Sequence, residues 1–131
     1  MSALHTRRVS VVLPVLNAAA WLPSLFDMLQ AQKPNPPDEI IVVDSGSKDD
    51  TRRIAAAQGN ARIVELSSFS HGRSRNLGAR EASGEVVVFL SQDAIPANSE
   101  WLAELLAPFD DANVAAVCSR QMPRPDAPPT E

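Results

Sequence analysis

Cysteine and long apolar runs are scarce in this sequence of 131 residues. The single cysteine, Cys118, excludes an internal disulfide framework and a zinc site built from several cysteines, and it is more typical of a reducing compartment. No apolar run approaches the roughly 20 residues that span a bilayer. The first residues, MSALHTRR, have no apolar stretch like that of a signal peptide. These absences predict a cytoplasmic location.

An excess of positive charge is also missing. Lysine and arginine number 12 against 16 acidic residues, which gives a formal net charge of −4 and a pI near 5.1. Broad electrostatic binding to nucleic acid or to an anionic membrane is therefore disfavoured. The composition, 44% hydrophobic and 21% charged, is globular. At 14.1 kDa the chain has the size of one domain, too short for separate nucleotide and substrate domains.

Several nucleotide and hydrolase motifs are absent as well. The sequence lacks the G-x-G-x-x-G fingerprint of dinucleotide sites and the P-loop pattern G-x-x-x-x-G-K-[ST]. Ser91 follows an apolar run, but no G-x-S-x-G elbow surrounds it. A response-regulator-like domain would need an acidic pair after its first strand and a late lysine, and the only lysines are Lys33 and Lys48. Each of these classes is disfavoured.

Apolar runs alternate with amphipathic segments along the chain. Strands are expected at 9–16, 39–44, 61–66, 85–91 and 113–119. Helices are expected at 17–31, after a Ser47–Asp50 capping pair, at 73–82 and at 100–107. This alternation predicts an α/β fold, a mostly parallel sheet with helices on both faces. The expected organisation is a flexible N-terminus (1–8), one domain (9–119) and a proline-rich tail (120–131).

Two aspartates follow apolar strands at the predicted sheet edge. In open α/β sheets, ligands bind at the carboxyl ends of the strands, where Asp44 and Asp93 are expected. Either one alone is as readily a turn or capping residue. Together they favour a ligand crevice. Asp93 is suited to a hard divalent cation that binds two phosphate oxygens, and Asp44 to a base N–H or a ribose hydroxyl.

The helix after His71 carries arginines near its start. Arg73 and Arg75 lie close to the positive end of the helix dipole, where a cation is disfavoured by roughly 0.3–1 kcal/mol unless an anion binds. Gly72 and Asn76 suit close approach to a polar ligand. The pattern favours a phosphate site over the alternative, a solvated basic face.

Four segments in order resemble glycosyltransferase family 2, which has the Rossmann-like GT-A fold: VSVVLPVLN, IIVVDSGSKDDT, FSHGRSRNLGAREASGE and VVFLSQDAIP. FSHGRSRN, SQDA and the later SRQMPRPDAPPTE look most like the rhamnosyltransferase-like branch. The resemblance covers the chain from Val9 to the tail and corresponds to the N-terminal, nucleotide-sugar-binding portion of such enzymes. It implies inverting transfer of a sugar, with rhamnose favoured, from a metal-bound nucleoside-diphosphate sugar to a saccharide or lipid-linked acceptor in polysaccharide biosynthesis.

The resemblance also implies roles for individual residues. Asp93 is the expected ligand of Mg or Mn, Arg75 lies near the donor diphosphate, and Asp44 contacts the base or ribose. The remaining expected contacts to the donor are Pro14, Asn17, Ser45, His71, Asn76 and Gln92. The metal motif reads Ser91-Gln92-Asp93, so the first acid of the family's Asp-x-Asp pattern is missing.

The catalytic base and the acceptor half are expected beyond Glu131, so little or no turnover is expected from this chain alone. The inner face of the membrane is an alternative location for such an enzyme. The alternative function is a non-catalytic α/β module for nucleotide binding or protein interaction, in which two copies pair through an exposed sheet edge. Only the first function requires metal-dependent nucleotide binding.

Overall fold

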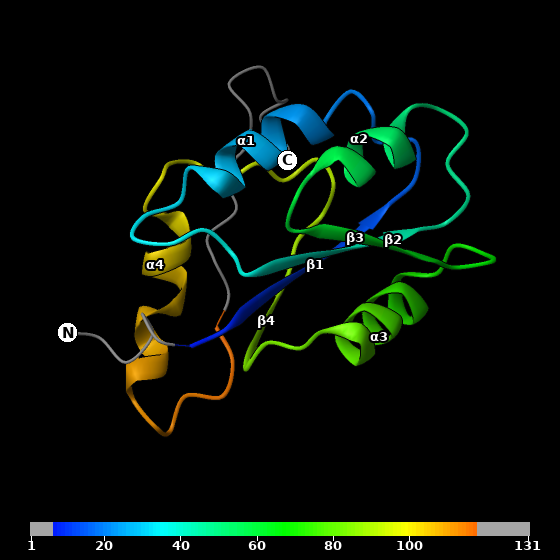
Figure 1. The fold of residues 1–131 in the computed structure, drawn as a ribbon. Helices are drawn as coiled ribbons and strands as arrows, with labels where there is room; N and C mark the ends of the chain where they lie inside the picture. Colours follow the sequence, from blue (N-terminus) through cyan, green and yellow to red (C-terminus); the bar gives the residue numbers. More distant parts are fainter. Residues whose placement is uncertain (1–6, 118–131) are drawn as a thin grey trace, which may run out of the picture.

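A four-stranded parallel sheet forms the centre of the fold in the computed structural model, which describes residues 7–117 (Figure 1). The strand order is β3-β2-β1-β4, and every pairing is parallel. The strands are β1 (Val9–Val15), β2 (Glu39–Asp44), β3 (Ala61–Glu65) and β4 (Val86–Phe89). The helices are α1 (Leu22–Gln30), α2 (Thr51–Ala57), α3 (His71–Glu81) and α4 (Trp101–Leu106), followed by the 3-10 helix η2 (Ala107–Asp110). The predicted alternation of strands and helices is confirmed.

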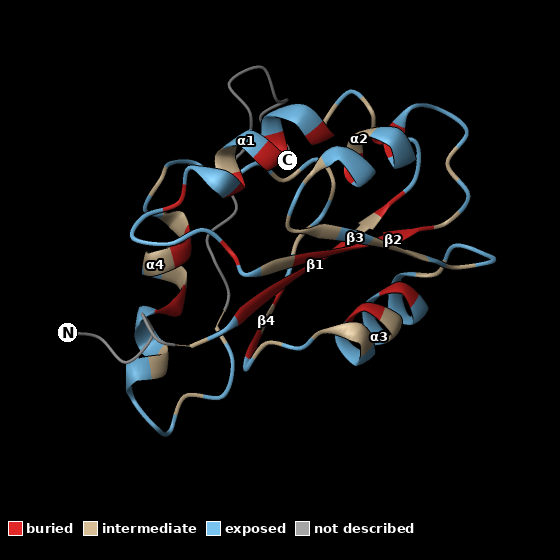
Figure 2. Ribbon diagram, in the orientation of Figure 1, coloured by how far each residue is buried: buried red, intermediate tan, exposed pale blue. Residues whose placement is uncertain are grey.

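Helices cover both faces of the sheet, as predicted. Successive side chains of a strand point to opposite faces, so β1 contributes to two clusters. Val11 and Leu13 lie in the larger cluster with apolar residues of α1, α2 and α4, whereas Val12 packs with Ile41 and Leu77 on the α3 side. Figure 2 shows that β1 and β2 are almost wholly buried. Their continuous apolar sequences fit strands that are covered on both faces.

The predicted strand at 113–119 is wrong for its described part. Residues 113–117 have turn and irregular backbone. An apolar segment forms a strand only where a neighbouring strand accepts its backbone hydrogen bonds. Within residues 7–117, β4 pairs with β1 alone and offers no pairing to 113–117. Cys118, the rest of that strand and the tail at 120–131 lie outside the described residues, as do residues 1–6.

Two helices begin later than predicted. The first begins at Leu22 rather than Asn17, and Asn17 has a left-handed φ of 51° that ends any helical run there. The second begins at Thr51 with Asp50 at its N-cap position, so the predicted capping pair is wrong. The hydroxyl of Ser47 donates to Asp44 instead. No helix among the described residues has the length and apolar character required to cross a membrane.

Candidate functional site

A hollow of about 430 Å³ lies at the carboxyl ends of β1 and β4. Helices α1 and α2 cover one face of the sheet, whereas α3, which leads into β4, covers the other (Figure 1). The winding of the chain therefore reverses between β1 and β4. In open α/β sheets, ligands bind in the crevice outside such a switch point. The hollow lies where this topology predicts a binding site.

Five of the nine predicted site residues line the hollow. His71 and Arg75 come from α3, Gln92 and Asp93 from the loop after β4, and Pro14 from β1. The apolar part of the lining consists of Val15, Leu16, Trp21, Phe69 and Leu90. Polar groups from two sides of the switch point thus converge on one cavity with an apolar wall, which is the usual composition of a small-molecule site.

Aromatic residues form part of this wall. The rings of Phe69 and His71 meet edge to face, with centroids 4.8 Å apart and an interplanar angle of 79°. Trp21 packs against the larger apolar cluster and also lines the hollow. His71 is therefore held by a ring contact at the start of α3.

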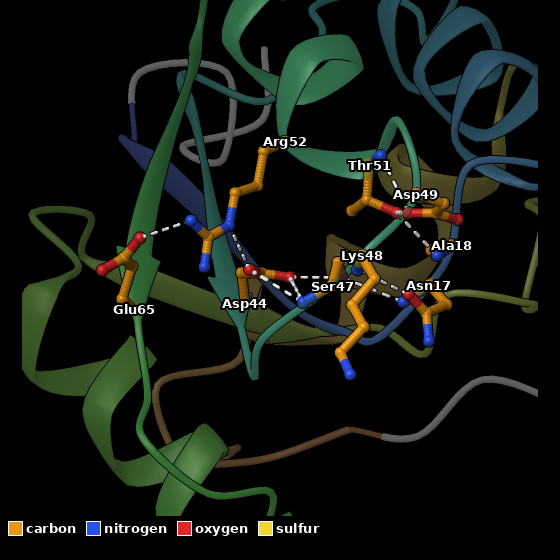
Figure 3. Close-up of polar contacts among 9 residues, drawn as sticks. All are labelled: Asn17, Ala18, Asp44, Ser47, Lys48, Asp49, Thr51, Arg52 and Glu65. Atoms are coloured by element: carbon orange, nitrogen blue, oxygen red, sulfur yellow. Dashed lines mark hydrogen bonds and ion pairs between the residues drawn. The ribbon is translucent and has the colours of Figure 1, made fainter.

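The other four predicted residues do not line this hollow. Asn76 is exposed on α3, next to Arg75. The Ser45 amide donates to the Val15 carbonyl at 3.2 Å, and the buried Ser45 hydroxyl has no partner among the described residues. Asn17 and Asp44 belong to a polar network at the end of β2, beside the hollow (Figure 3).

Asp44 is the centre of this network. Its side chain has no exposed surface. It accepts hydrogen bonds from the amide and hydroxyl of Ser47, and its Oδ2 accepts from Arg52 Nε at 2.7 Å. Arg52 Nη1 also lies 2.9 Å from Glu65 Oε1 (Figure 3). Sequence reasoning missed Arg52, because nothing in the pair Arg52-Arg53 distinguishes the one that turns toward Asp44.

These contacts keep Asp44 ionised. Burial by itself raises the pKa of Asp44, but the hydrogen bonds from Ser47 and Arg52 outweigh it, and the pKa lies below its usual value. The hydrogen bond with Asp44, with the nearby charge of Glu65, raises the pKa of Arg52 further. The carboxylate of Asp44 at the end of β2 is therefore buried and hydrogen-bonded, and its partner Arg52 is half-exposed.

Side chains from neighbouring loops hold the segment between β1 and α1. Four successive amides donate to them: Leu16 N to Gln92 Oε1 (2.9 Å), Asn17 N to Ser47 Oγ (2.9 Å), Ala18 N to Thr51 Oγ1 (2.8 Å) and Ala19 N to Asp49 Oδ2 (3.1 Å). Asn17 Oδ1 in turn accepts from Lys48 N at 2.8 Å. The segment satisfies its backbone without a helix, which explains the late start of α1.

The acidic residues Asp49 and Asp50 have structural partners. Asp49 Oδ1 accepts from the Thr51 amide at 3.0 Å and from the Thr51 hydroxyl, and these bonds lower its pKa. Asp50 forms an exposed ion pair with Arg53. Asp49 therefore stabilises the start of α2, and Asp50 is a surface charge.

The start of α3 separates its two arginines. Ser70 is the N-cap, and its hydroxyl accepts from the Arg73 amide at 3.3 Å. Arg73 Nη1 lies 3.3 Å from the Ser68 hydroxyl and so turns toward the preceding loop. Arg75 alone of the two lines the hollow. The helix begins at His71, two residues earlier than predicted.

A divalent cation fits this site only together with a ligand. Within residues 7–117, no group of three or more histidine, cysteine, aspartate or glutamate side chains could hold a metal ion. Asp93 is the one carboxylate of the described residues that line the hollow. Mg²⁺ is commonly held by one or two carboxylates plus substrate phosphates and water. The donor set fits a cation that arrives with a phosphate ligand.

The fold and the hollow define a class of protein, the open α/β domains with a cavity at a switch point of the sheet. The model of the family "Glycosyl transferase family 2" matches residues 10–130, and the chain belongs to this family.

Two relatives narrow the resemblance within the family. The chain is 40% identical over 125 residues to the O-antigen chain rhamnosyltransferase RfbN of Salmonella typhimurium. The aligned region covers 93% of this chain and 40% of that protein. The chain is 44% identical over 124 residues to the O-antigen chain rhamnosyltransferase WbaN of Salmonella anatum, with coverage of 92% and 39%. The chain thus spans about two fifths of the length of these relatives. The expected resemblance to the rhamnosyltransferase-like branch is confirmed.

The same fold occurs in solved glycosyltransferases. Glucosyl-3-phosphoglycerate synthase of Mycobacterium tuberculosis, in complex with Mn²⁺, UDP and glucosyl-3-phosphoglycerate, matches with a TM-score of 0.65 and 35% identity over 82% of this chain and 41% of that chain. This neighbour has the GT-A fold, so the predicted fold class is confirmed.

Proposed function

We propose that this chain binds the donor of a sugar-transfer reaction, a nucleoside-diphosphate sugar, in the hollow at the switch point. The observation that carries the proposal is the convergence of Arg75 from α3 and Asp93 from the loop after β4 on one cavity. A guanidinium suits phosphate oxygens, and a carboxylate suits the cation that bridges them. The relatives named as rhamnosyltransferases, and the neighbour that contains UDP and Mn²⁺, support this ligand.

Each residue has a proposed role. Asp93 would hold Mg²⁺ or Mn²⁺ together with the diphosphate of the donor, and Arg75 would bind the same diphosphate. His71 and Pro14 border the donor, and Asn76 lies beside Arg75. Four further residues are proposed to contact the nucleoside part of the donor: Asn17, Asp44, Ser45 and Gln92.

The proposed reaction is a single displacement with inversion. The acceptor hydroxyl attacks the anomeric carbon, and the nucleoside diphosphate leaves. A divalent cation held by Asp93 would neutralise charge on the leaving diphosphate. Arg75 adds hydrogen bonds that strengthen as that charge develops. The proposed sugar is rhamnose, with dTDP as its carrier, and the proposed acceptor is a saccharide or a lipid-linked saccharide at the cytoplasmic side of the membrane.

No general base is assigned to residues 7–117. An inverting transfer needs a group within hydrogen-bond reach of the acceptor hydroxyl. We propose that this base and the acceptor site belong to the part of the relatives' length that this chain does not cover. The chain then supplies donor binding, and transfer is a property of the longer protein.

Calorimetric titration of UDP and dTDP, with and without Mn²⁺, tests donor binding. Asp93→Ala is expected to remove the increase in affinity that Mn²⁺ causes, because the carboxylate that holds the cation is gone. Asp27→Ala changes the same charge on the exposed side of α1 and serves as the matched control. Absence of binding at millimolar nucleotide, in a sample whose circular dichroism shows folded protein, would refute the proposal.

A further inference from the structure

Asp44 is where the family resemblance places a contact to the base or ribose, but a ligand cannot reach its carboxylate in this structure. The side chain has 0% exposed surface. Ser47 donates to it through both amide and hydroxyl, and Arg52 Nε occupies Oδ2 at 2.7 Å. A base N–H could bond to Asp44 only if Ser47 or Arg52 moved away. That movement would leave a buried carboxylate with fewer partners, which is costly.

Arg52 offers donors at the same place. Its side chain is 48% exposed, while Nε bonds to Asp44 and Nη1 lies 2.9 Å from Glu65. A guanidinium has five N–H groups. Among residues 7–117, Nη2 has no acceptor. The two N–H groups of Nη2 therefore remain as donors at the carboxyl edge of the sheet.

The two acids hold this guanidinium in a fixed orientation. Asp44 and Glu65 are partners in the register of β2 and β3, so Arg52 bridges the ends of two adjacent strands (Figure 3). A long side chain that is fixed in advance loses less entropy when a ligand binds. The guanidinium of Arg52 is thus preorganised to donate a hydrogen bond to a ligand, whereas the carboxylate of Asp44 could only accept one.

The position of Arg52 matches the far end of the proposed ligand. Asp93 follows β4, and two interstrand steps of about 4.8 Å each lead through β1 to the end of β2. A nucleoside diphosphate held by its diphosphate at Asp93 and Arg75, and extended along this edge, places its base toward β2 and β3.

We propose that Arg52 binds the nucleobase, donating from Nη2 to a ring carbonyl oxygen of uracil or thymine, and that Asp44 and Glu65 are positioning residues that hold the guanidinium. This inference rests on the proposed function and changes the role of Asp44 from a base contact to a support. A carbonyl acceptor, rather than a ring N–H, becomes the feature of the base that this part of the chain recognises.

Binding of two ligands to three proteins tests the inference. UDP and inorganic pyrophosphate are titrated in the presence of Mn²⁺ into the wild-type chain, Arg52→Ala and Arg53→Ala. Loss of a charge-assisted hydrogen bond predicts about tenfold weaker UDP binding by Arg52→Ala. Pyrophosphate has no base, so its affinity is expected to stay unchanged. Arg53, the exposed neighbour on α2, pairs with Asp50, and its removal controls for the lost charge.

Three outcomes would overturn the inference. The first is Arg52→Ala binding UDP as tightly as wild type or more tightly, which would mean that Asp44 contacts the base once uncovered, or that neither residue does. The second is an equal loss for UDP and pyrophosphate, which would indicate a general effect of charge or structure. The third is an equal loss of UDP binding in Arg53→Ala.

Failure of the proposed function is distinguishable from failure of this inference. If the proposed function is wrong, the wild-type chain binds neither UDP nor pyrophosphate. If Arg52→Ala does not fold, Arg52→Lys is the second variant. It keeps the charge but not the planar fork, and it is expected to show the same selective loss of UDP binding.

Discussion

Gly78 lies where α3 packs against β1, and alanine at this position is expected to destabilise the protein. A Cβ on Gly78 would lie 2.2 Å from Val12 Cγ1, 3.1 Å from Cγ2 and 3.2 Å from the valine Cβ. Val12 is fully buried in the middle of the sheet. A β-branched side chain has few alternative rotamers, and rotation would leave the other close contacts in place. The helix must therefore move away from the sheet.

The size of the effect follows from this clash. Carbon atoms in contact prefer separations of about 3.5–4.0 Å, so α3 must withdraw by roughly 1.3 Å. Overpacking of a core costs typically about 1–3 kcal/mol, and this clash with a fixed partner belongs at the upper end. Alanine gains up to about 1 kcal/mol over glycine in helix propensity. The expected net loss is about 2 kcal/mol, or roughly 8 °C in Tm for a domain of this size.

Urea and thermal unfolding followed by circular dichroism measure this loss. Gly72→Ala is the matched control, because a Cβ there meets nothing within 4 Å and the residue lies in the same helix. It is expected to leave stability unchanged or slightly increased. The double variant Val12→Ala/Gly78→Ala should lose less unfolding free energy than the two single variants lose in sum, because the γ carbons that clash with the new Cβ are gone. Equal stability of Gly78→Ala and Gly72→Ala would refute the reasoning.

Two further substitutions test the polar networks. Glu39 Oε2 accepts from Ser10 Oγ and from the amide and hydroxyl of Ser83; burial raises its pKa, but these bonds lower the pKa below the usual 4.5. The stabilisation by ionised Glu39 is therefore complete above the pKa of the unfolded state and is lost as the pH falls through the lower pKa of the folded state. Glu39→Gln should lower the unfolding free energy by about 1 kcal/mol at pH 7 and by less at pH 3, as measured by urea unfolding. An equal cost at both pH values would contradict this. Thr51→Val removes the buried acceptor of the Ala18 amide and should cost about 1–3 kcal/mol, whereas Thr51→Ser should cost clearly less.

Elements whose signal is local could be predicted from the sequence. The apolar runs that became β1 and β2 are continuous because helices cover both faces of the sheet. The segment 113–117 has the same kind of pattern, yet it is not a strand. Its composition permits a strand, but the presence of a partner strand is a property of the whole fold.

The segment between β1 and α1 shows the same limit at the candidate site. Its amides bond to side chains 30 to 76 residues away in the sequence. The spacing of apolar residues does not reveal such partners, so it predicts a helix from Asn17 where the structure has none. Likewise, Arg52 and Arg53 are alike in the sequence. Only the phase of α2 turns the first toward Asp44 and the second toward Asp50.

The polar edge of the sheet has two parts with different properties. On the β1–β2 side, the successive amides and the carboxylate of Asp44 have partners, which makes this side a rigid support. On the β4 side, Arg75 and Asp93 line an open hollow. Gln92 joins the two parts, because its Oε1 accepts from Leu16 N at 2.9 Å and Asp93 is the next residue. Under the proposed function, Asp93 holds a cation with few other protein ligands, so its carboxylate needs a fixed position. The bond from Leu16 N to the side-chain oxygen of Gln92 restrains the residue next to Asp93, which offers a physical reason for glutamine at this position.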